Sequence, residues 1–308
     1  MKQAFIVGSD KGGVGKTEVA CQIYLKLLDL DAQVGFGEVD SVQRASALLG
    51  SDVDVSLKLT EDLLAQVSAH PLAAEQFFGP LLDVLADPDS DAAVVDLGAT
   101  VSGQVLDWMQ NQDALELMED EQYRPVFVAV TAPEASALAG AVRFIEKAQR
   151  LAGDRADYVL ALNDTLGSGF DFIESAGSEK DLVDRVKAQH ELHVVTLPHA
   201  RRTKLISFAR RFNLGLHEVY RLGDALKTLI EDRKATEDPA LKQLEAELGL
   251  VDLGSRAQRL LSIRTEVREV LKWLVQTHAA FDVFIDTGAL AHTSSGDEEE
   301  VSDDDDDE

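Results

Sequence analysis

Residues 8–17 read Gly-Ser-Asp-Lys-Gly-Gly-Val-Gly-Lys-Thr, and they join a short apolar run at 4–7 to an amphipathic stretch at 16–29. The apolar run has the composition of a buried strand, and apolar residues of the later stretch recur at helical spacing. Glycines let the backbone N–H groups of such a loop turn inward around phosphate oxygens, and the start of the helix adds positive charge. The sequence therefore predicts a phosphate-binding loop at residues 8–17.

The loop also carries side chains suited to a nucleoside triphosphate. The Lys16 ammonium group can pair with the β- and γ-phosphates, and the Thr17 hydroxyl can bind Mg²⁺. The strict phosphate-loop pattern begins with glycine, whereas this chain has Asp10 at that position. We predict that the nucleotide is contacted by Gly12, Gly13, Val14, Gly15, Lys16, Thr17 and Glu18.

Short apolar runs alternate with helical patterns over the first two thirds of the chain. The predicted strands are 4–7, 33–39, 92–96, 126–130, 158–162 and 193–197, and the predicted helices include 16–29, 60–69, 71–86, 134–151 and 178–190. This alternation is typical of the α/β class, in which a mostly parallel, doubly wound sheet carries helices on both faces.

The last third of the chain has a mainly helical pattern. We expect helices at 201–211, 216–232, 238–248 and 255–277, and an extra edge strand at 281–285. No linker rich in Gly, Ser or Pro separates two domains. The predicted organisation is a P-loop NTPase core over 1–215, a mainly helical part over 216–290 packed on the core, and a disordered acidic tail over 291–308.

The composition is that of a soluble globular protein, since 45% of the 308 residues are hydrophobic and 28% are charged. The single cysteine, Cys21, excludes an intramolecular disulfide and a metal site built from several thiolates. No apolar run reaches the roughly 18 residues of a membrane span. Residues 1–8 run directly into the loop and leave no room for a signal peptide, so we expect a cytoplasmic protein.

The chain is strongly acidic, with 56 Asp and Glu residues against 29 Lys and Arg residues and a net charge of −27. Residues 297–308 contain acids and no base, and they have the composition of a solubilising tail, a decoy for nucleic acid or a docking tail. The overall field opposes binding to DNA and to anionic membranes, so a DNA contact needs a local basic patch.

Residues 11–17, KGGVGKT, resemble the deviant Walker A motif of the ParA/MinD ATPases. In that family a second, signature lysine precedes the glycines, and Lys11 holds this place. The resemblance implies an ATP-sandwich homodimer, in which Lys11 neutralises charge on the nucleotide of the opposite subunit. It covers roughly residues 1–215 and implies that ATP and Mg²⁺ are the ligands.

Three acids match the family by order and spacing. Residues 37–41, GEVDS, resemble the segment after strand two. The resemblance gives Asp40 the role of orienting the attacking water and sensing the γ-phosphate, and places Glu38 near Mg²⁺ through water. Asp96 ends an apolar strand, where a carboxylate is costly unless it holds a cation or a hydrogen-bond network, and the resemblance gives it a water-mediated contact to Mg²⁺.

Two further positions are assigned to the base by the same resemblance. Asn163 follows the strand at 158–162 and would read the adenine edge, and the backbone at Pro198 would line the base. The chain departs from the family at Glu18, where a small or hydroxyl residue is usual, and at Glu38, where aspartate is more common.

The function that this resemblance implies is a slow, partner-stimulated ATPase. ATP binding would dimerise it, and an adaptor or activator protein would trigger hydrolysis as the protein partitions or positions a cargo such as DNA, a conjugation complex or a protein assembly. Two alternatives stay open: an ATP-dependent enzyme similar to amidoligases or dethiobiotin synthetase, and a nucleotide-gated scaffold with little hydrolysis.

Two basic stretches are candidates for non-specific DNA binding. One contains Arg201, Arg202 and Lys204, and the other contains Arg264 and Arg268 within the predicted helix 255–277. Such residues would bind phosphates without sequence preference and in a salt-sensitive way. The second stretch is also typical of an amphipathic helix that packs by its apolar face.

Overall fold

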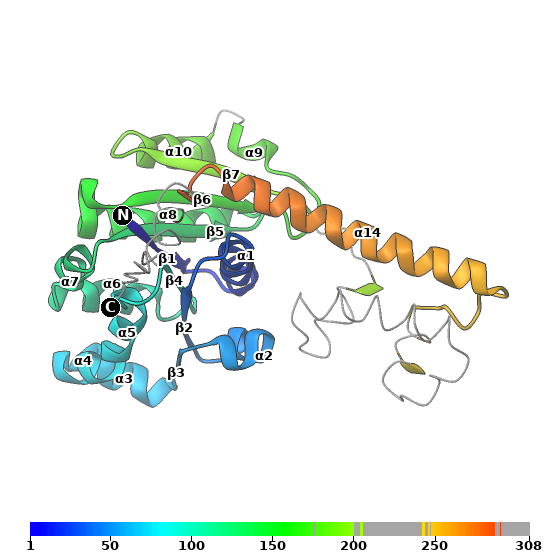
Figure 1. Cartoon of the computed structure of the whole chain (residues 1–308). Helices are drawn as coiled ribbons and strands as arrows, with labels where there is room; N and C mark the ends of the chain where they lie inside the picture. The colour runs from blue at the N-terminus through cyan, green and yellow to red at the C-terminus, as the bar shows by residue number, and fades with distance from the viewer. Residues whose placement is uncertain are drawn as a thin grey trace, which may run out of the picture.

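Seven strands, all parallel, form the sheet around which this chain folds (Figure 1). The computed structural model describes residues 1–174, 177–199, 204–205, 242–243, 246, 248–286 and 290. The strand order is β3-β2-β4-β1-β5-β6-β7. Their bounds are β1 Lys2–Gly8, β2 Val34–Asp40, β3 Val55–Lys58, β4 Ala92–Leu97, β5 Tyr123–Thr131, β6 Asp157–Asn163 and β7 Leu192–Leu197.

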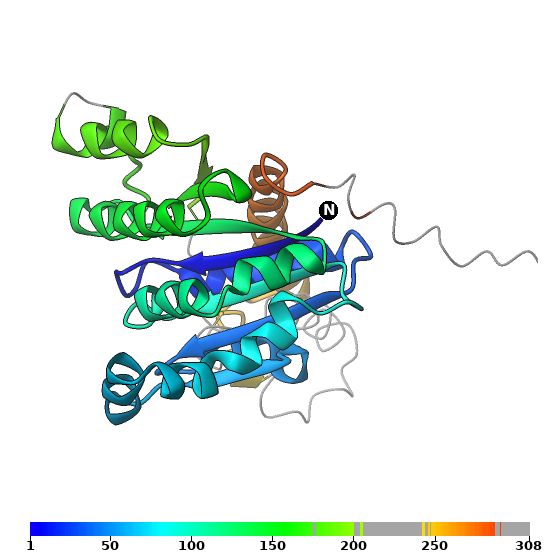
Figure 2. The ribbon, with the colours of Figure 1, turned by 90° about the vertical axis from the view of Figure 1, so that its left-hand side faces the viewer.

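Helices connect the strands and cover both faces of the sheet. They are α1 Lys16–Leu28, α2 Arg44–Leu49, α3 Glu61–Ala69, α4 Pro71–Phe78, α5 Leu82–Leu85, α6 Ser102–Asn111, α7 Ala114–Asp120, α8 Ala135–Ala152, α9 Asp171–Glu174, α10 Ser178–Lys187 and α14 Arg256–Phe281. Short 3₁₀ turns lie at Gly50–Asp52, Gly79–Leu81 and Gly153–Arg155. Figure 2 shows helices coloured cyan to green in front of the sheet and α14, in orange, behind it.

Two apolar cores lie on opposite faces of the sheet because neighbouring residues of a strand point to opposite sides. In β1, Ile6 belongs to the core under α6 and α8, whereas Phe5 and Val7 belong to the core under α1 and α14. β4 is buried along its whole length. A strand buried on both faces is what a parallel sheet between two helical layers requires, so the predicted doubly wound fold is confirmed.

The six strands predicted in the first two thirds of the chain are all present, and the structure adds β3, which the sequence does not predict. β3 lies inside the segment 51–90, for which only helices were expected, and it forms one edge of the sheet beside β2. Its side chains alternate between half-buried and exposed. The predicted helix 71–86 is also divided, because Gly79 and Pro80 form a 3₁₀ turn between α4 and α5.

The predicted edge strand at 281–285 is wrong. Phe281 ends α14, and its carbonyl accepts hydrogen bonds from the N–H groups of Phe284 (3.1 Å) and Ile285 (3.0 Å), which close a turn. The run is apolar because these three side chains fill the core on the α1 side of the sheet. The expected helices at 201–211, 216–232 and 238–248 lie largely outside the described residues, as does the acidic tail.

The predicted helix at 255–277 is confirmed as α14, which begins at a capping box formed by Ser255 and Gln258. Its C-terminal half packs against α1 and β7, and its N-terminal half extends beyond the sheet (Figure 1). None of the helices in the described ranges is both long and apolar enough to cross a membrane.

Candidate functional site

The glycine-rich loop lies between β1 and α1, at the carboxyl edge of the sheet where β1, β2 and β4 end side by side. Gly13 has φ +77° and Gly15 has φ +89°, a left-handed backbone that favours glycine. A Cβ atom added at Gly12 or Gly13 would meet no atom within 4 Å. The loop therefore presents open backbone at the start of a helix, as a phosphate group requires.

Lys16 is buried beneath this loop. Its side-chain Nζ donates a hydrogen bond to the Lys11 carbonyl oxygen at 2.9 Å. Burial lowers the pKa of Lys16, whereas the nearby carboxylates of Asp96 and Asp40 oppose that shift. The structure thus brings the predicted cation and two predicted acids into one electrostatic neighbourhood.

Asp96 is a buried carboxylate without a hydrogen bond. The residue is 1% exposed, and neither carboxylate oxygen has a partner of standard geometry in the described part of the chain. Burial raises the pKa of Asp96 to about 7, and the neighbouring Thr17 hydroxyl counteracts that rise. Burying an unpaired carboxylate costs free energy. The environment of Asp96 is therefore that of a carboxylate that binds a cation.

Asp40, the last residue of β2, lies against Gly98, which directly follows β4. A Cβ atom on Gly98 would lie 2.5 Å from Asp40 Oδ1 and 3.2 Å from its Cα. The Gly98 N–H donates to the Val39 carbonyl at 2.7 Å, and Asp40 Oδ1 accepts from the Ser41 N–H at 2.6 Å. The absence of a side chain at residue 98 therefore allows the Asp40 carboxylate to lie at the end of β4.

Glu38 is buried and holds the segment that follows β2. Its Oε1 accepts from the Ala45 N–H at 2.7 Å, and its Oε2 accepts from the Ser46 N–H at 3.1 Å and the Ser46 hydroxyl at 2.7 Å. The Ser56 hydroxyl of β3 also donates to Oε2, at 3.2 Å. The structure therefore engages both oxygens of Glu38 with α2 and β3, and its predicted place near Mg²⁺ stays a prediction.

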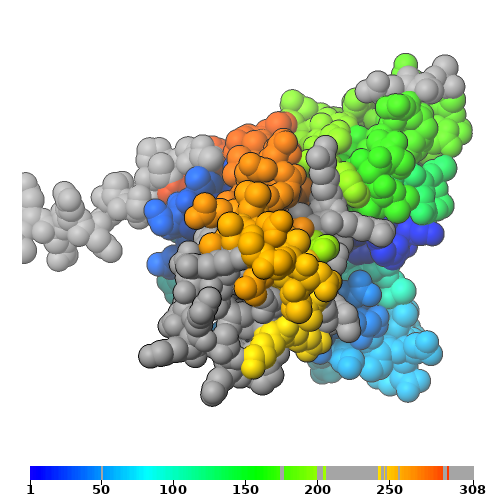
Figure 3. Space-filling view, turned by 90° about the vertical axis from the view of Figure 1, so that its right-hand side faces the viewer, coloured from blue at the N-terminus to red at the C-terminus, as the bar shows by residue number. Residues whose placement is uncertain are grey.

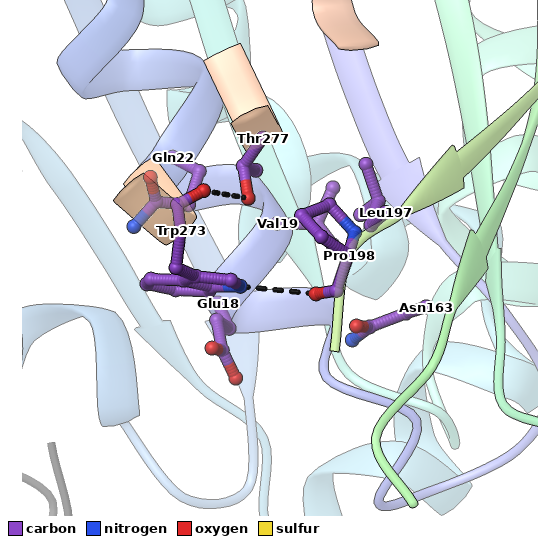
Figure 4. A pocket seen from close by; sticks show the side chains of 8 residues that line it. All are labelled: Glu18, Val19, Gln22, Asn163, Leu197, Pro198, Trp273 and Thr277. Atoms are coloured by element: carbon purple, nitrogen blue, oxygen red, sulfur yellow. Dashed lines mark hydrogen bonds between the residues drawn. The ribbon is translucent and has the colours of Figure 1, made fainter. Parts of the chain in front are cut away.

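Asn163, at the end of β6, links the loop to a neighbouring recess. Its Nδ2 donates to the Val14 carbonyl at 3.0 Å, and it lies where a side chain at Gly15 would be. The recess (Figure 4) is lined by residues from α1, β6, β7 with the residue after it, and α14, namely Glu18, Val19, Gln22, Asn163, Leu197, Pro198, Trp273 and Thr277.

Three residues assigned to the nucleotide from the sequence, Glu18, Asn163 and Pro198, thus meet in this recess. Trp273 of α14 lines it as well, a contact that the sequence does not predict. No local pattern could have revealed the contact, since 75 residues separate Trp273 from Pro198 in the chain.

Asp10, which replaces the first glycine of the strict pattern, pairs with α8. Arg143 Nε donates to its Oδ2 at 2.9 Å. Nearby, a Cβ atom at Gly140 would lie 3.3 Å from the Lys11 backbone nitrogen. The start of α8 therefore packs closely on the loop, while Lys11 itself is exposed to solvent.

The second predicted basic stretch lies on α14. Arg264 and Arg268 are exposed on α14, and Lys272 continues the same face one turn further on. None of the three forms an ion pair with another described residue. Figure 3 shows α14, in orange and yellow, with its outer surface uncovered.

Lys204 is also exposed, and its Nζ donates to the Leu248 carbonyl at 2.8 Å. Its backbone N–H donates to Glu266 of α14 at 2.8 Å, so the structure brings this residue beside α14. Arg201 and Arg202 lie outside the described residues.

The donor set at the loop fits Mg²⁺. Among the described residues, no three His, Cys, Asp or Glu side chains gather into a metal cage. Mg²⁺ is usually held by one or two carboxylates together with substrate phosphates, rather than by an all-protein cage. The orphaned carboxylate of Asp96, beside the Thr17 hydroxyl, supplies the oxygen ligands that such a site needs.

No protein-family model and no curated protein sequence matches this chain. Its structure is similar to the MinC:MinD cell division protein complex of Aquifex aeolicus, with 16% identity and a TM-score of 0.40 over 83% of this chain and 97% of that chain. It is also similar to apo McdA of Cyanthece, with 14% identity and a TM-score of 0.40 over 71% of this chain and 93% of that chain. A plasmid partition protein of Borrelia burgdorferi is 13% identical, with a TM-score of 0.39 over 69% of this chain and 96% of that chain.

Proposed function

We propose that this chain binds ATP in the loop at residues 8–17 and hydrolyses it slowly. The observation that carries the proposal is the position of Asp96, a buried carboxylate that accepts no hydrogen bond of standard geometry from the described residues and lies near the glycine-rich loop and the buried Lys16. A phosphate-bound cation would satisfy that carboxylate. A loop with a purely structural role would gain nothing from leaving it unpaired.

The side chains around the loop would contact the phosphates, Mg²⁺ and the attacking water. Lys16 exchanges the Lys11 carbonyl for phosphate oxygens, and the loop N–H groups surround those oxygens. Thr17, Asp96 and Asp40 would hold Mg²⁺, with Glu38 further out, and the bound ion would neutralise charge on the β- and γ-phosphates. Asp40 would orient the water for in-line attack, because its carboxylate lies at the end of β4, beside the loop.

Two copies of the chain would enclose the nucleotides between them. Lys11 supports this part of the proposal, since it is exposed on the loop while its backbone is held by Lys16 and packed against Gly140. An exposed lysine in this position can reach a phosphate group of the opposite subunit. Dimerisation would then depend on ATP, and hydrolysis would release the subunits.

The cellular role that fits such a cycle is the positioning or partition of a cargo, with a protein adaptor that stimulates hydrolysis. Arg264 and Arg268 of α14, together with Arg201, Arg202 and Lys204, are the candidates for non-specific DNA contact. The exposed face of α14 supports this role for its two arginines, and the net charge of −27 confines such contact to a local patch.

Calorimetric titration of ADP with Mg²⁺ tests the nucleotide site. Lys16→Ala should weaken binding by at least about ten-fold, because a charge-assisted contact worth more than about 1.4 kcal/mol is removed. Lys180→Ala, a change at an exposed lysine of α10, serves as the matched control. Equal affinities for the two variants would refute the site. Turnover that requires a small carboxylate substrate would favour the metabolic-enzyme alternative.

A further inference from the structure

Trp273 brings α14 to the recess beside the phosphate loop. Its indole Nε1 donates to the Pro198 carbonyl at 3.0 Å, and the residue is 8% exposed (Figure 4). This hydrogen bond fixes the orientation of the ring. The indole therefore forms one side of the recess, together with Glu18 of α1 and Asn163 of β6.

The half of α14 that carries Trp273 is firmly attached to the sheet. The Thr277 hydroxyl donates to the Trp273 carbonyl at 2.9 Å, and Lys26 Nζ donates to the His278 carbonyl at 2.9 Å. His278 also contacts Gln22 of α1 at 3.2 Å, and Phe281 is fully buried in the core. The indole is therefore held in place by the fold and does not depend on a ligand for its position.

The recess adjoins the phosphate loop at Asn163. Asn163 forms part of both, since it bonds to the Val14 carbonyl of the loop and also lines the recess. The lining combines an aromatic ring and apolar side chains with two amides, a hydroxyl and a carboxylate. Such a mixture suits the apolar face and the polar edge of a planar heterocycle. The free volume is about 10 Å³, so side chains that line the recess must move for a base to enter.

We propose that the base of the bound nucleotide packs against Trp273, which makes α14 a part of the nucleotide site. This inference rests on the proposed nucleotide binding and adds to it a base-contacting residue from outside the core. The same helix carries the exposed Arg264 and Arg268. A base bound at Trp273 would therefore contact the helix that presents these cations.

A single-tryptophan protein makes the contact visible. Trp108 lies on α6 in the opposite core, and its Nε1 has no hydrogen-bond partner among the described residues, so Trp108→Phe removes no hydrogen bond. In this background the Trp273 emission reports on the recess alone. ADP with Mg²⁺ should shift the emission, whereas inorganic tripolyphosphate, which has no base, should not.

Affinity measurements separate a base contact from a loss of packing. Trp273→Ala should weaken ADP binding by roughly ten-fold, because base–aromatic stacking contributes about that factor. Tripolyphosphate binding should be unchanged. Leu274→Ala is the matched control, since this neighbouring side chain has the same 8% exposure but does not line the recess. Trp273→Phe, which keeps an aromatic face, should recover most of the affinity.

The outcomes are distinguishable. Equal loss of ADP affinity in Trp273→Ala and Leu274→Ala, or equal loss of ADP and tripolyphosphate affinity in Trp273→Ala, would overturn the base contact while leaving nucleotide binding intact. No binding of either ligand to the unsubstituted chain would refute the proposed function itself, and the base contact with it.

Discussion

Single residues at the carboxyl edge of the sheet determine the geometry of the candidate site. Gly98 has no side chain where Asp40 needs space, and Gly140 allows α8 to approach Lys11. The roles of the loop residues could be predicted from the sequence, since all of these residues suit a phosphate ligand. Their partners could not, because Glu38 bonds to α2 and Trp273 reaches Pro198 only after the chain has folded.

Replacement of Gly98 should impair hydrolysis more than binding. In Gly98→Ala the new Cβ would lie 2.5 Å from Asp40 Oδ1, so the carboxylate must move from the end of β4. We expect ATP turnover to fall by at least about ten-fold, as for a displaced catalytic group, while ADP affinity stays within about three-fold. Gly79→Ala, where a Cβ meets nothing within 4 Å, is the control. Normal turnover in Gly98→Ala would contradict the role of Asp40.

Removal of the charge at Asp96 should stabilise the ligand-free protein. The carboxylate is 1% exposed and accepts no hydrogen bond of standard geometry from a described residue. At about pH 8, above its pKa of about 7, Asp96→Asn therefore replaces a costly buried charge by a neutral amide of similar shape. Thermal unfolding in a chelator should shift upward by at least about 2 °C. Mg²⁺-dependent nucleotide affinity should fall in the same variant. A lower melting temperature together with normal nucleotide affinity would show that Asp96 has a structural role.

Secondary-structure elements were predictable where their pattern is long or fully apolar. The buried runs of β1, β4 and β5 and the long helix α14 are of this kind. The sequence does not predict β3 because its four residues alternate between half-buried and exposed at a sheet edge and so make a weak pattern. The run 281–285 was mistaken for a strand because core-filling aromatic residues after a helix resemble a strand in composition.

The attachment of α14 to α1 should weaken in acid. Burial lowers the pKa of His278, against the opposing effect of Asp29, with Lys26 and Asp282 also nearby. The unfolded chain therefore binds a proton more readily than the folded chain, so stability is lost as pH falls from about 6.5. In His278→Gln, denaturant unfolding between pH 7 and pH 5 should show a smaller loss of stability. An unchanged pH dependence would exclude His278 as the titrating group.

The chain combines a strongly negative net charge with an exposed cationic face on α14. The chain carries −27, yet Arg264, Arg268 and Lys272 lie together on the outer surface of α14. The sequence predicts that α14 packs by its apolar face, but not which elements of the core cover that face. Trp273, Leu274 and Phe281 turn inward and leave the cations outside.

Charge reversal on this face should abolish retention on DNA. With ATP and Mg²⁺ at low salt, we expect the unsubstituted chain to bind duplex DNA of any sequence, and the Arg264→Glu/Arg268→Glu chain to lose that binding. The Arg150→Glu/Arg185→Glu chain carries the same charge change on α8 and α10 and should keep it. Equal retention by both double variants would move the DNA contact away from α14, and binding by neither would implicate net charge alone.

The ATP-dependent dimer is the central claim, and light scattering coupled to size exclusion tests it most directly. The Asp40→Ala chain should be monomeric with ADP and dimeric with ATP and Mg²⁺, because it binds ATP but cannot orient the attacking water. Adding Lys11→Ala to that chain should remove the dimer and leave ATP bound. The same monomeric mass with ADP and with ATP would contradict the sandwich mechanism, and a dimer that persists without the Lys11 side chain would contradict the role given to that lysine.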